Sequence, residues 1–160
     1  MRYFFVALVL FIIAIFGIGY YVTFANTISA NEQVFAAGTL PEYIPNGQYV
    51  GKTDMIIPFW EGQSFNAKTQ TGINNFRFTQ IYRFGISVGT SLTNPKLSVI
   101  TLDYNKPYTT LPLRPFLAEL VQTKDGTFLG KLYLRIIPGH PFILGFYTLS
   151  FEHPNYHPLF

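Results

Sequence analysis

The densest run of apolar residues lies near the beginning of the chain. Residues 3–25 contain no charged side chain, and Arg2 is the only charged side chain before them. As an α-helix, this run would be roughly 34 Å long, enough to cross a hydrocarbon core of about 30 Å. An apolar run of this length without a polar face is not typical of a helix in a small soluble core. We therefore expect residues 1–25 to form a signal anchor or transmembrane helix.

A cleaved signal peptide is the alternative interpretation of the same run. Aromatic residues at 3–5 and 20–24 resemble the interfacial belts of a membrane helix, which favours a retained anchor. Gly17 and Gly19 could instead interrupt the helix, and small residues near Ala25 weakly match a cleavage site. Cleavage would leave a secreted domain.

The basic residues around the run predict its orientation. Arg2 precedes the run, and the next basic residue after it is Lys52. The positive-inside rule therefore predicts a single-pass protein with a cytoplasmic N-terminus and an extracytoplasmic domain. The chain contains neither cysteine nor an Asn-x-Ser/Thr sequon, which fits a bacterial periplasm.

After the apolar run, the pattern changes to short alternations separated by Gly, Pro and Asn. Residues 26–44 are mostly polar and unpatterned, which predicts a linker that holds a domain off the membrane. Residues 34–37 could instead pack against that domain. In residues 82–88 apolar side chains alternate with polar or small ones, and residues 128–137 repeat this pattern.

Turn signals divide the remainder into strands. Lys124-Asp125-Gly126-Thr127 predicts a hairpin, and Pro115 predicts one helical turn that ends near Leu120. Aromatic residues make up 18% of the chain, and 13 Gly and 11 Pro punctuate it, which favours β structure. We expect about seven or eight strands in one domain, residues 45–152, followed by a tail, residues 153–160. The predicted fold class is all-β, an antiparallel up-and-down barrel or alternatively a β-sandwich.

The segment Asn46-Gly47-Gln48-Tyr49-Val50-Gly51 resembles the G-x-W start of the first strand in lipocalins and other calycins. Tyr49 takes the place of the family's Trp, since the only Trp of the chain is Trp60. The resemblance implies a barrel with a hydrophobic internal cavity, in which a late basic residue, Arg135 or Lys131, packs over Tyr49. Residues 51–74 also resemble uncharacterised, membrane-anchored bacterial envelope proteins of calycin-like type, a likeness that implies no activity.

Candidate catalytic and metal-binding residues are few. Gly89-Thr90-Ser91 does not match a nucleophile elbow. His153 and His157 lie in a Pro-containing, extended segment where they would not share a face. We expect the acids Asp54, Glu61, Asp103 and Glu119 to pair with basic side chains, so the sequence favours no enzyme, no cofactor and no metal. The formal charge of +3 comes from scattered residues, which does not indicate a nucleic-acid partner.

These observations favour non-catalytic binding of an apolar small molecule such as a lipid, or of another envelope component. The alternative is an accessory subunit of a membrane protein complex, in which Ala14, Gly17 and Gly19 allow close contact with other membrane helices. An apolar barrel interior has the same sequence pattern whether it is filled or hollow. The candidate ligand-binding residues are Tyr49, Trp60, Phe84, Tyr104, Tyr133 and Arg135.

Overall fold

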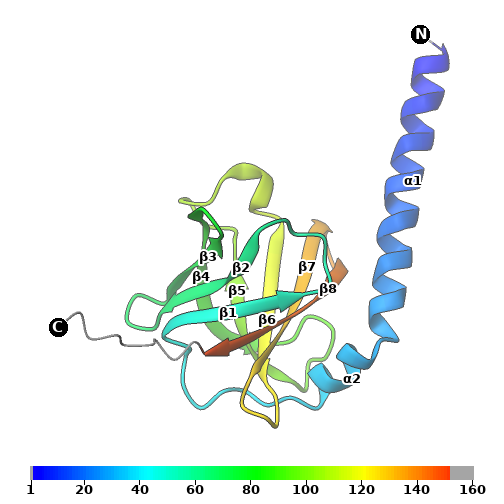
Figure 1. Ribbon diagram of the computed structural model, residues 1–160. Helices are drawn as coiled ribbons and strands as arrows, with labels where there is room; N and C mark the ends of the chain where they lie inside the picture. Colours follow the sequence, from blue (N-terminus) through cyan, green and yellow to red (C-terminus); the bar gives the residue numbers. More distant parts are fainter. Residues whose placement is uncertain (1, 152–160) are drawn as a thin grey trace.

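Eight antiparallel strands close into a barrel, and a long helix stands beside it (Figure 1). The computed structural model describes residues 2–151. Each strand pairs with its neighbours in sequence, and β8 closes the barrel on β1, with Phe151 opposite Tyr49. The predicted antiparallel barrel is therefore confirmed, in preference to the sandwich. The strands are β1 (Gly47–Thr53), β2 (Trp60–Asn66), β3 (Thr71–Phe76), β4 (Thr79–Thr90), β5 (Ser98–Asp103), β6 (Phe116–Gln122), β7 (Phe128–Ile137) and β8 (His140–Phe151).

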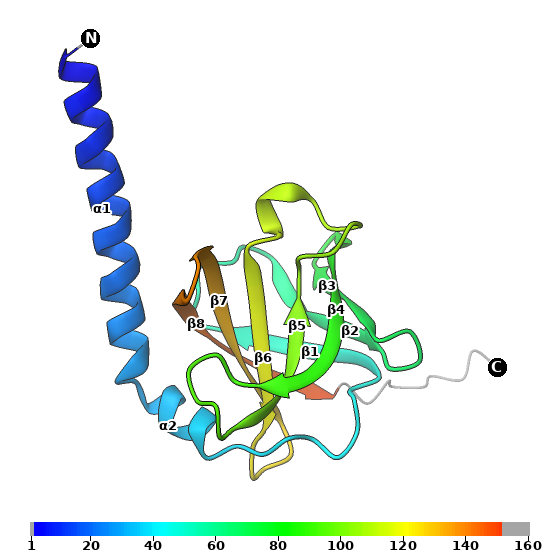
Figure 2. The same cartoon turned by 180° about the vertical axis from the view of Figure 1, so that it is seen from behind.

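The apolar run forms one continuous helix, α1 (Arg2–Thr27). It contains the segment Phe4–Thr27, which is long and apolar enough to cross a membrane. Gly17 and Gly19 do not interrupt it. The C-terminal half of α1 runs beside β8, and its N-terminal half extends beyond the barrel (Figures 1 and 2).

The segment predicted to be a linker contains a second helix, α2 (Ala30–Ala36), which begins at a Ser29 cap. The Ser29 hydroxyl accepts a hydrogen bond from the backbone N–H of Glu32 at 3.2 Å, a capping contact typical of helix N-termini. Phe35 of α2 is only 1% exposed and packs on Val121, Leu129 and Phe146 of the barrel. Residues 26–44 are therefore more than a spacer between the membrane and the domain. Of residues 34–37, which could pack against the domain, Phe35 does so.

The prediction of a helical turn after Pro115 was wrong. Residues 116–122 form β6, in which Leu120 pairs with Ile100 of β5 and with Gly130 of β7. Pairing on both sides outweighs the local helix propensity of Glu119 and Leu120. The short helix of this region, η1 (Leu111–Leu113), is a 3₁₀ turn that precedes the strand.

The two ends of the barrel differ in their interior. The loops after β1, β3, β5 and β7 lie at one end, here called the mouth end, and those after β2, β4 and β6 lie at the other. A cluster of buried large side chains fills the interior toward the far end, among them Phe65, Phe84, Ile100, Leu120 and Leu149. Toward the mouth end the interior is hollow, as described next.

Candidate functional site

A cavity of about 380 Å³ occupies the mouth end of the barrel. Small-molecule sites have volumes of roughly 300–1,000 Å³, so the cavity is large enough for a small-molecule ligand. Its walls are mostly apolar and include Met55, Ile57, Phe116, Leu132 and Leu144. None of the described residues that line it is charged.

The floor of the cavity carries a small set of hydrogen-bonded polar groups. The Tyr104 hydroxyl oxygen accepts hydrogen bonds from Asn74 Nδ2 at 2.8 Å and from Gln63 Nε2 at 3.5 Å. Asn74 Oδ1 accepts from Trp60 Nε1 at 3.1 Å and from Gln63 Nε2 at 3.2 Å. Burial raises the pKa of Tyr104 to about 12, so this phenol is neutral at physiological pH.

Two polar atoms of this floor make no hydrogen bond of regular geometry, although the Gln63 side chain lies close enough to the Tyr147 hydroxyl to lower its pKa in part. They are Gln63 Oε1, an acceptor, and the Tyr147 hydroxyl, a donor and acceptor. Gln63 is 2% exposed and Tyr147 is 4% exposed, and both line the cavity. Burial raises the pKa of Tyr147, so its hydroxyl keeps its proton at neutral pH. Buried polar groups are nearly always hydrogen-bonded. Both atoms are shielded from the cavity, so a ligand's polar group would reach them only after the Gln63 or Tyr147 side chain turned toward it.

Irregular backbone around the mouth places some of these side chains. Register shifts interrupt the ladder of β2 with β3 between Trp60 and Gly62 and the ladder of β3 with β4 opposite Ile73 and Asn74, where Tyr82 of β4 is the extra residue. Such bulges redirect side chains, and here both Trp60 and Asn74 contribute to the cavity wall. Tyr82, which also lines the cavity, has a left-handed φ of 64°, and its carbonyl accepts a hydrogen bond from Asn74 Nδ2 at 3.0 Å. Strained backbone of this kind clusters at functional sites.

The structure brings together only part of the predicted set of ligand-binding residues. Trp60 and Tyr104 line the cavity. Tyr49 and Phe84 belong to the packed interior. The other two candidates interact away from the cavity, because the Tyr133 hydroxyl donates to Glu119 and Arg135 pairs with Asp103 at 2.9 Å.

Sequence reasoning missed Gln63, Asn74 and Tyr147. A signal for two of them was present in the strand alternation. Gln63 is in phase with the inward-facing Phe65, and Asn74 is in phase with Gly72, whose Cβ position lies against the buried Phe84 ring. A polar residue at a core-facing position of a strand is informative because its burial requires a partner.

The calycin resemblance implies that Lys131 or Arg135 packs over Tyr49, but both of these residues lie elsewhere. Tyr49 packs edge-on against the rings of Phe65 and Phe128, at 5.4 and 5.5 Å between ring centres. Lys131 Nζ instead lies 5.1 Å from the ring centre of Phe35, under α2. Arg135 makes the ion pair described above.

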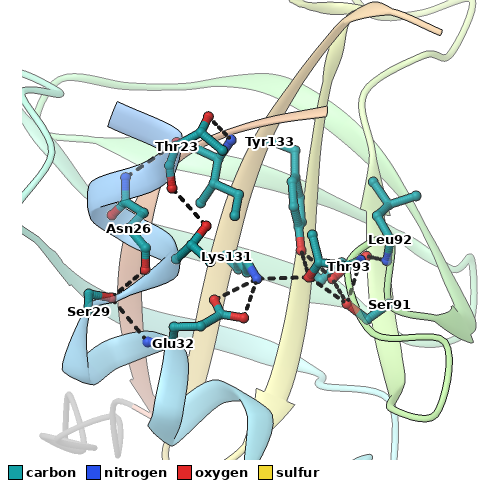
Figure 3. A network of polar contacts seen from close by, with 12 residues as sticks. Thr23, Asn26, Ser29, Glu32, Ser91, Leu92, Thr93, Lys131 and Tyr133 are labelled. Atoms are coloured by element: carbon teal, nitrogen blue, oxygen red, sulfur yellow. Dashed lines mark hydrogen bonds and ion pairs between the residues drawn. The ribbon is translucent and has the colours of Figure 1, made fainter. Parts of the chain in front are cut away.

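Lys131 is at the centre of a buried polar network on the outside of the barrel (Figure 3). Its side chain is 0% exposed, and its Nζ forms an ion pair with Glu32 of α2 at 2.6 Å. Nζ also donates to Thr93 Oγ1 at 2.9 Å, in the loop after β4. A fully buried cation needs such partners to be tolerated, so Glu32 fixes α2 to the barrel at this point.

Glu119 extends the network on the neighbouring strand. Its carboxylate accepts hydrogen bonds from Ser91 Oγ at 2.7 Å, from the Leu92 amide at 2.6 Å and from the Tyr133 hydroxyl at 2.8 Å. Ser91 therefore holds the loop after β4 against the Glu119 carboxylate. This contact gives both Ser91 and Glu119 a structural role. The tail with His153 and His157 lies outside the described residues.

Polar contacts also fix α1 to the barrel. The Ile143 amide donates to Thr23 Oγ1 at 3.0 Å, and Asn26 Nδ2 donates to the Ile143 carbonyl at 3.3 Å. These contacts lie beside a register shift between β7 and β8, in the part of β8 before Tyr147 where β1 does not pair with it. The helix is therefore joined to the barrel by hydrogen bonds as well as by apolar packing.

The small residues of α1 have different surroundings. A Cβ on Gly19 would lie 3.3 Å from the Phe142 ring, so Gly19 allows close contact between α1 and β8. The Phe142 ring also contacts Tyr20 at 5.3 Å between ring centres. Ala14 and Gly17 are exposed, and nothing lies within 4 Å of the Cβ position of Gly17.

A comparison of the chain with protein-family models, with curated proteins and with solved structures found no match.

Proposed function

We propose that this protein is a membrane-anchored, extracytoplasmic binding protein that holds a lipid-like small molecule in its barrel without catalysis. The observation that carries the proposal is an apolar cavity of about 380 Å³ whose lining includes a small buried set of polar side chains, Gln63, Asn74, Tyr104 and Tyr147. A few polar groups in an otherwise apolar pocket are typical of small-molecule sites, in which they orient the ligand.

The chemistry of the floor favours a ligand with one uncharged polar group. If the two side chains turn toward the cavity, a ligand hydroxyl can donate to Gln63 Oε1 and accept from Tyr147. A carboxylate or phosphate would lose its hydration without gaining a cation, because no charged side chain lines the cavity. The preferred class is therefore a long-chain alcohol, a glyceride or a similar neutral lipid.

The position of α1 supports a retained membrane anchor. A cleaved signal peptide has no need of specific contacts with the mature domain, whereas Thr23 and Asn26 of α1 are hydrogen-bonded to Ile143 of β8. Arg2 before the span and the absence of further basic residues up to Lys52 favour a cytoplasmic N-terminus. The barrel then lies outside the cytoplasm, in a bacterial cell in the periplasm.

The test is to extract the full-length chain from membranes in mild detergent and to identify bound apolar molecules by mass spectrometry. Leu113 lines the cavity, whereas Leu111 in the same turn is 72% exposed and does not. Leu113→Trp should fill the cavity and abolish co-purification, and Leu111→Trp, the matched control, should retain the ligand. Equal amounts of lipid on both variants, or no neutral lipid on the native chain, would refute the proposal.

One observation favours a second function, that of an accessory subunit in a membrane protein complex. Ala14 and Gly17 leave an exposed stretch of small side chains on α1, which would allow another helix to approach closely. In this case the chain extracted in mild detergent should migrate with partner chains in a larger particle. A lone monomer would contradict this second function and leave the first one in place.

A further inference from the structure

The mouth end of the barrel exposes large apolar side chains at the tips of its loops. Ile56, Phe78 and Leu111 are 97%, 82% and 72% exposed, and they belong to the loops after β1, β3 and β5. Phe59 is also exposed, and its ring lies 6.1 Å from that of Phe78. Clustered exposed apolar residues usually mark a protein or membrane contact.

The loops at the far end have a different character. Those after β2 and β6 present Lys68, Lys124 and Asp125 rather than large apolar side chains. Large apolar side chains are also exposed at the far end, among them Leu92 in the loop after β4 and Tyr43 in the segment before β1, which are 47% and 74% exposed. Ile56 and Phe78 are nevertheless the most exposed large apolar side chains of the described residues, and both belong to mouth loops, where Ile56 itself contributes to the cavity wall.

The same end of the barrel faces the direction in which α1 extends (Figures 1 and 2). The first ring contact between α1 and the barrel joins Phe16 to Phe142, near the turn between β7 and β8, and residues 4–15 before it are exposed. These twelve positions span only about 18 Å at 1.5 Å per residue.

That length is too short to cross a bilayer. A hydrocarbon core of about 30 Å requires roughly eight more residues, residues 16–23, and these lie alongside β8. A tilted helix would cover even less of the thickness, so still more of it would be needed. If α1 crosses the membrane, the mouth end of the barrel must reach the level of the lipid headgroups or enter the acyl region.

We propose that the mouth end of the barrel inserts its apolar tips, Ile56, Phe59, Phe78 and Leu111, into the outer leaflet of the membrane that α1 spans. The partner of this surface is the bilayer itself. The inference rests on the anchoring role proposed for α1. It adds a route for the ligand: a neutral lipid enters the cavity directly from the leaflet, without passing through water.

Charge and rigidity both support this arrangement. Arg114, in the loop that carries Leu111, can contact anionic headgroups, whereas Arg77 and Lys106 of the mouth loops pair with Glu61 and Asp103. Basic side chains behind apolar tips are typical of interfacial membrane contacts. The contacts of Thr23 and Glu32 with the barrel fix the orientation of the mouth relative to α1.

The absence of cysteine allows a direct test with single-cysteine variants. The full-length chain is placed in nanodiscs of phosphatidylcholine and phosphatidylglycerol, with an environment-sensitive fluorophore on Phe78→Cys or Leu111→Cys. Lys68→Cys and Lys124→Cys report on the far end, and Ile12→Cys reports on α1. Quenching by spin-labelled lipid is compared with quenching by aqueous iodide.

We expect the labels at the mouth end to be quenched several-fold more by the spin-labelled lipid than the labels at the far end. Equal quenching at both ends, with the Ile12 label still quenched by lipid, would overturn this inference and leave the anchor in place. An Ile12 label that lipid does not quench would overturn the anchor and this inference together. Mouth labels shielded from both quenchers would mean that a protein covers the tips, which also overturns it.

Discussion

Replacement of Tyr147 by Phe should make the ligand-free protein more stable and the binding site weaker. The Tyr147 hydroxyl is buried below the floor of the cavity and makes no hydrogen bond of regular geometry. Tyr147→Phe removes only this oxygen and keeps the ring, which packs edge-on against Trp60 at 5.3 Å between ring centres. The variant therefore separates the cost of the unpaired hydroxyl from the packing of the side chain.

The expected magnitude follows from the cost of an unpaired polar group. Burial of a hydroxyl without a partner costs about 1–3 kcal/mol, so the free energy of unfolding should rise by about 1–2 kcal/mol in Tyr147→Phe. For a chain of this size, that gain corresponds to an increase in Tm of about 2–8 °C. Loss of one hydrogen bond to the ligand should weaken binding by roughly 2- to 10-fold.

The assay is thermal unfolding of the delipidated chain in detergent, with binding of a long-chain alcohol measured on the same preparations. Tyr104→Phe is the matched control, because the Tyr104 hydroxyl accepts hydrogen bonds from Asn74 and Gln63. Its removal leaves both amides without this partner, so Tyr104→Phe should lower the unfolding free energy by about 1–3 kcal/mol. If Tyr147→Phe destabilised the protein as much as Tyr104→Phe does, Tyr147 would already have a partner in the free protein and the reasoning would be refuted.

Three further predictions concern the supports of the site. Glu32→Ala should cost about 3–5 kcal/mol in denaturant unfolding because it leaves the fully buried Lys131 unpaired, whereas adding Lys131→Met should recover most of the loss; a double variant as unstable as Glu32→Ala would contradict this. Burial tends to raise the pKa of Asp103, but the hydrogen bond from the Asn105 amide and two neighbouring cations outweigh it and lower the pKa. The Asp103 carboxylate therefore stabilises the fold fully above its ordinary pKa near 3.9 and loses this effect as pH falls through the lower folded pKa, so the Tm difference between native and Asp103→Asn should be constant near neutrality and vanish in strong acid; a difference that persists there would count against the ion pairs. Phe35→Ala should cost about 3–5 kcal/mol and expose the α2 region to protease, while the exposed neighbour Val34→Ala should change neither; equal effects would show that Phe35 does not fix α2.

The barrel was predictable because alternation along the strands carries the information. In β4, Phe84 and Ile86 are buried inward-facing residues separated by a small one, and this period of two specifies a strand. The helix was predictable because its composition leaves no polar face. Residues 116–122 were not predictable locally, since their strand depends on β5 and β7, which lie before and after it in the sequence.

The cavity depends on features that alternation does not record. Whether an inward-facing side chain fills the barrel or lines a hollow is decided by the register shifts at Trp60 and Asn74 and by the shape of the loops after β1 and β5. The prediction that Tyr133 and Arg135 bind the ligand failed for a related reason. Tyr133 is fully buried, but its hydroxyl joins the Glu119 network under the loop after β4, and that covering loop is a matter of tertiary structure.

The filled interior at the far end has a consequence for how the protein would work. Phe84, Ile100, Leu120 and Leu149 pack across the barrel and leave no passage along its axis. The cavity is therefore closed toward the far end. A molecule held in it would have to leave through the mouth, where it entered. Such a barrel cannot act as a conduit that moves cargo away from the membrane through its length. A barrel closed at this end fits the proposed lipid-binding role as a reservoir, which would take a lipid out of the leaflet and release it through the same opening.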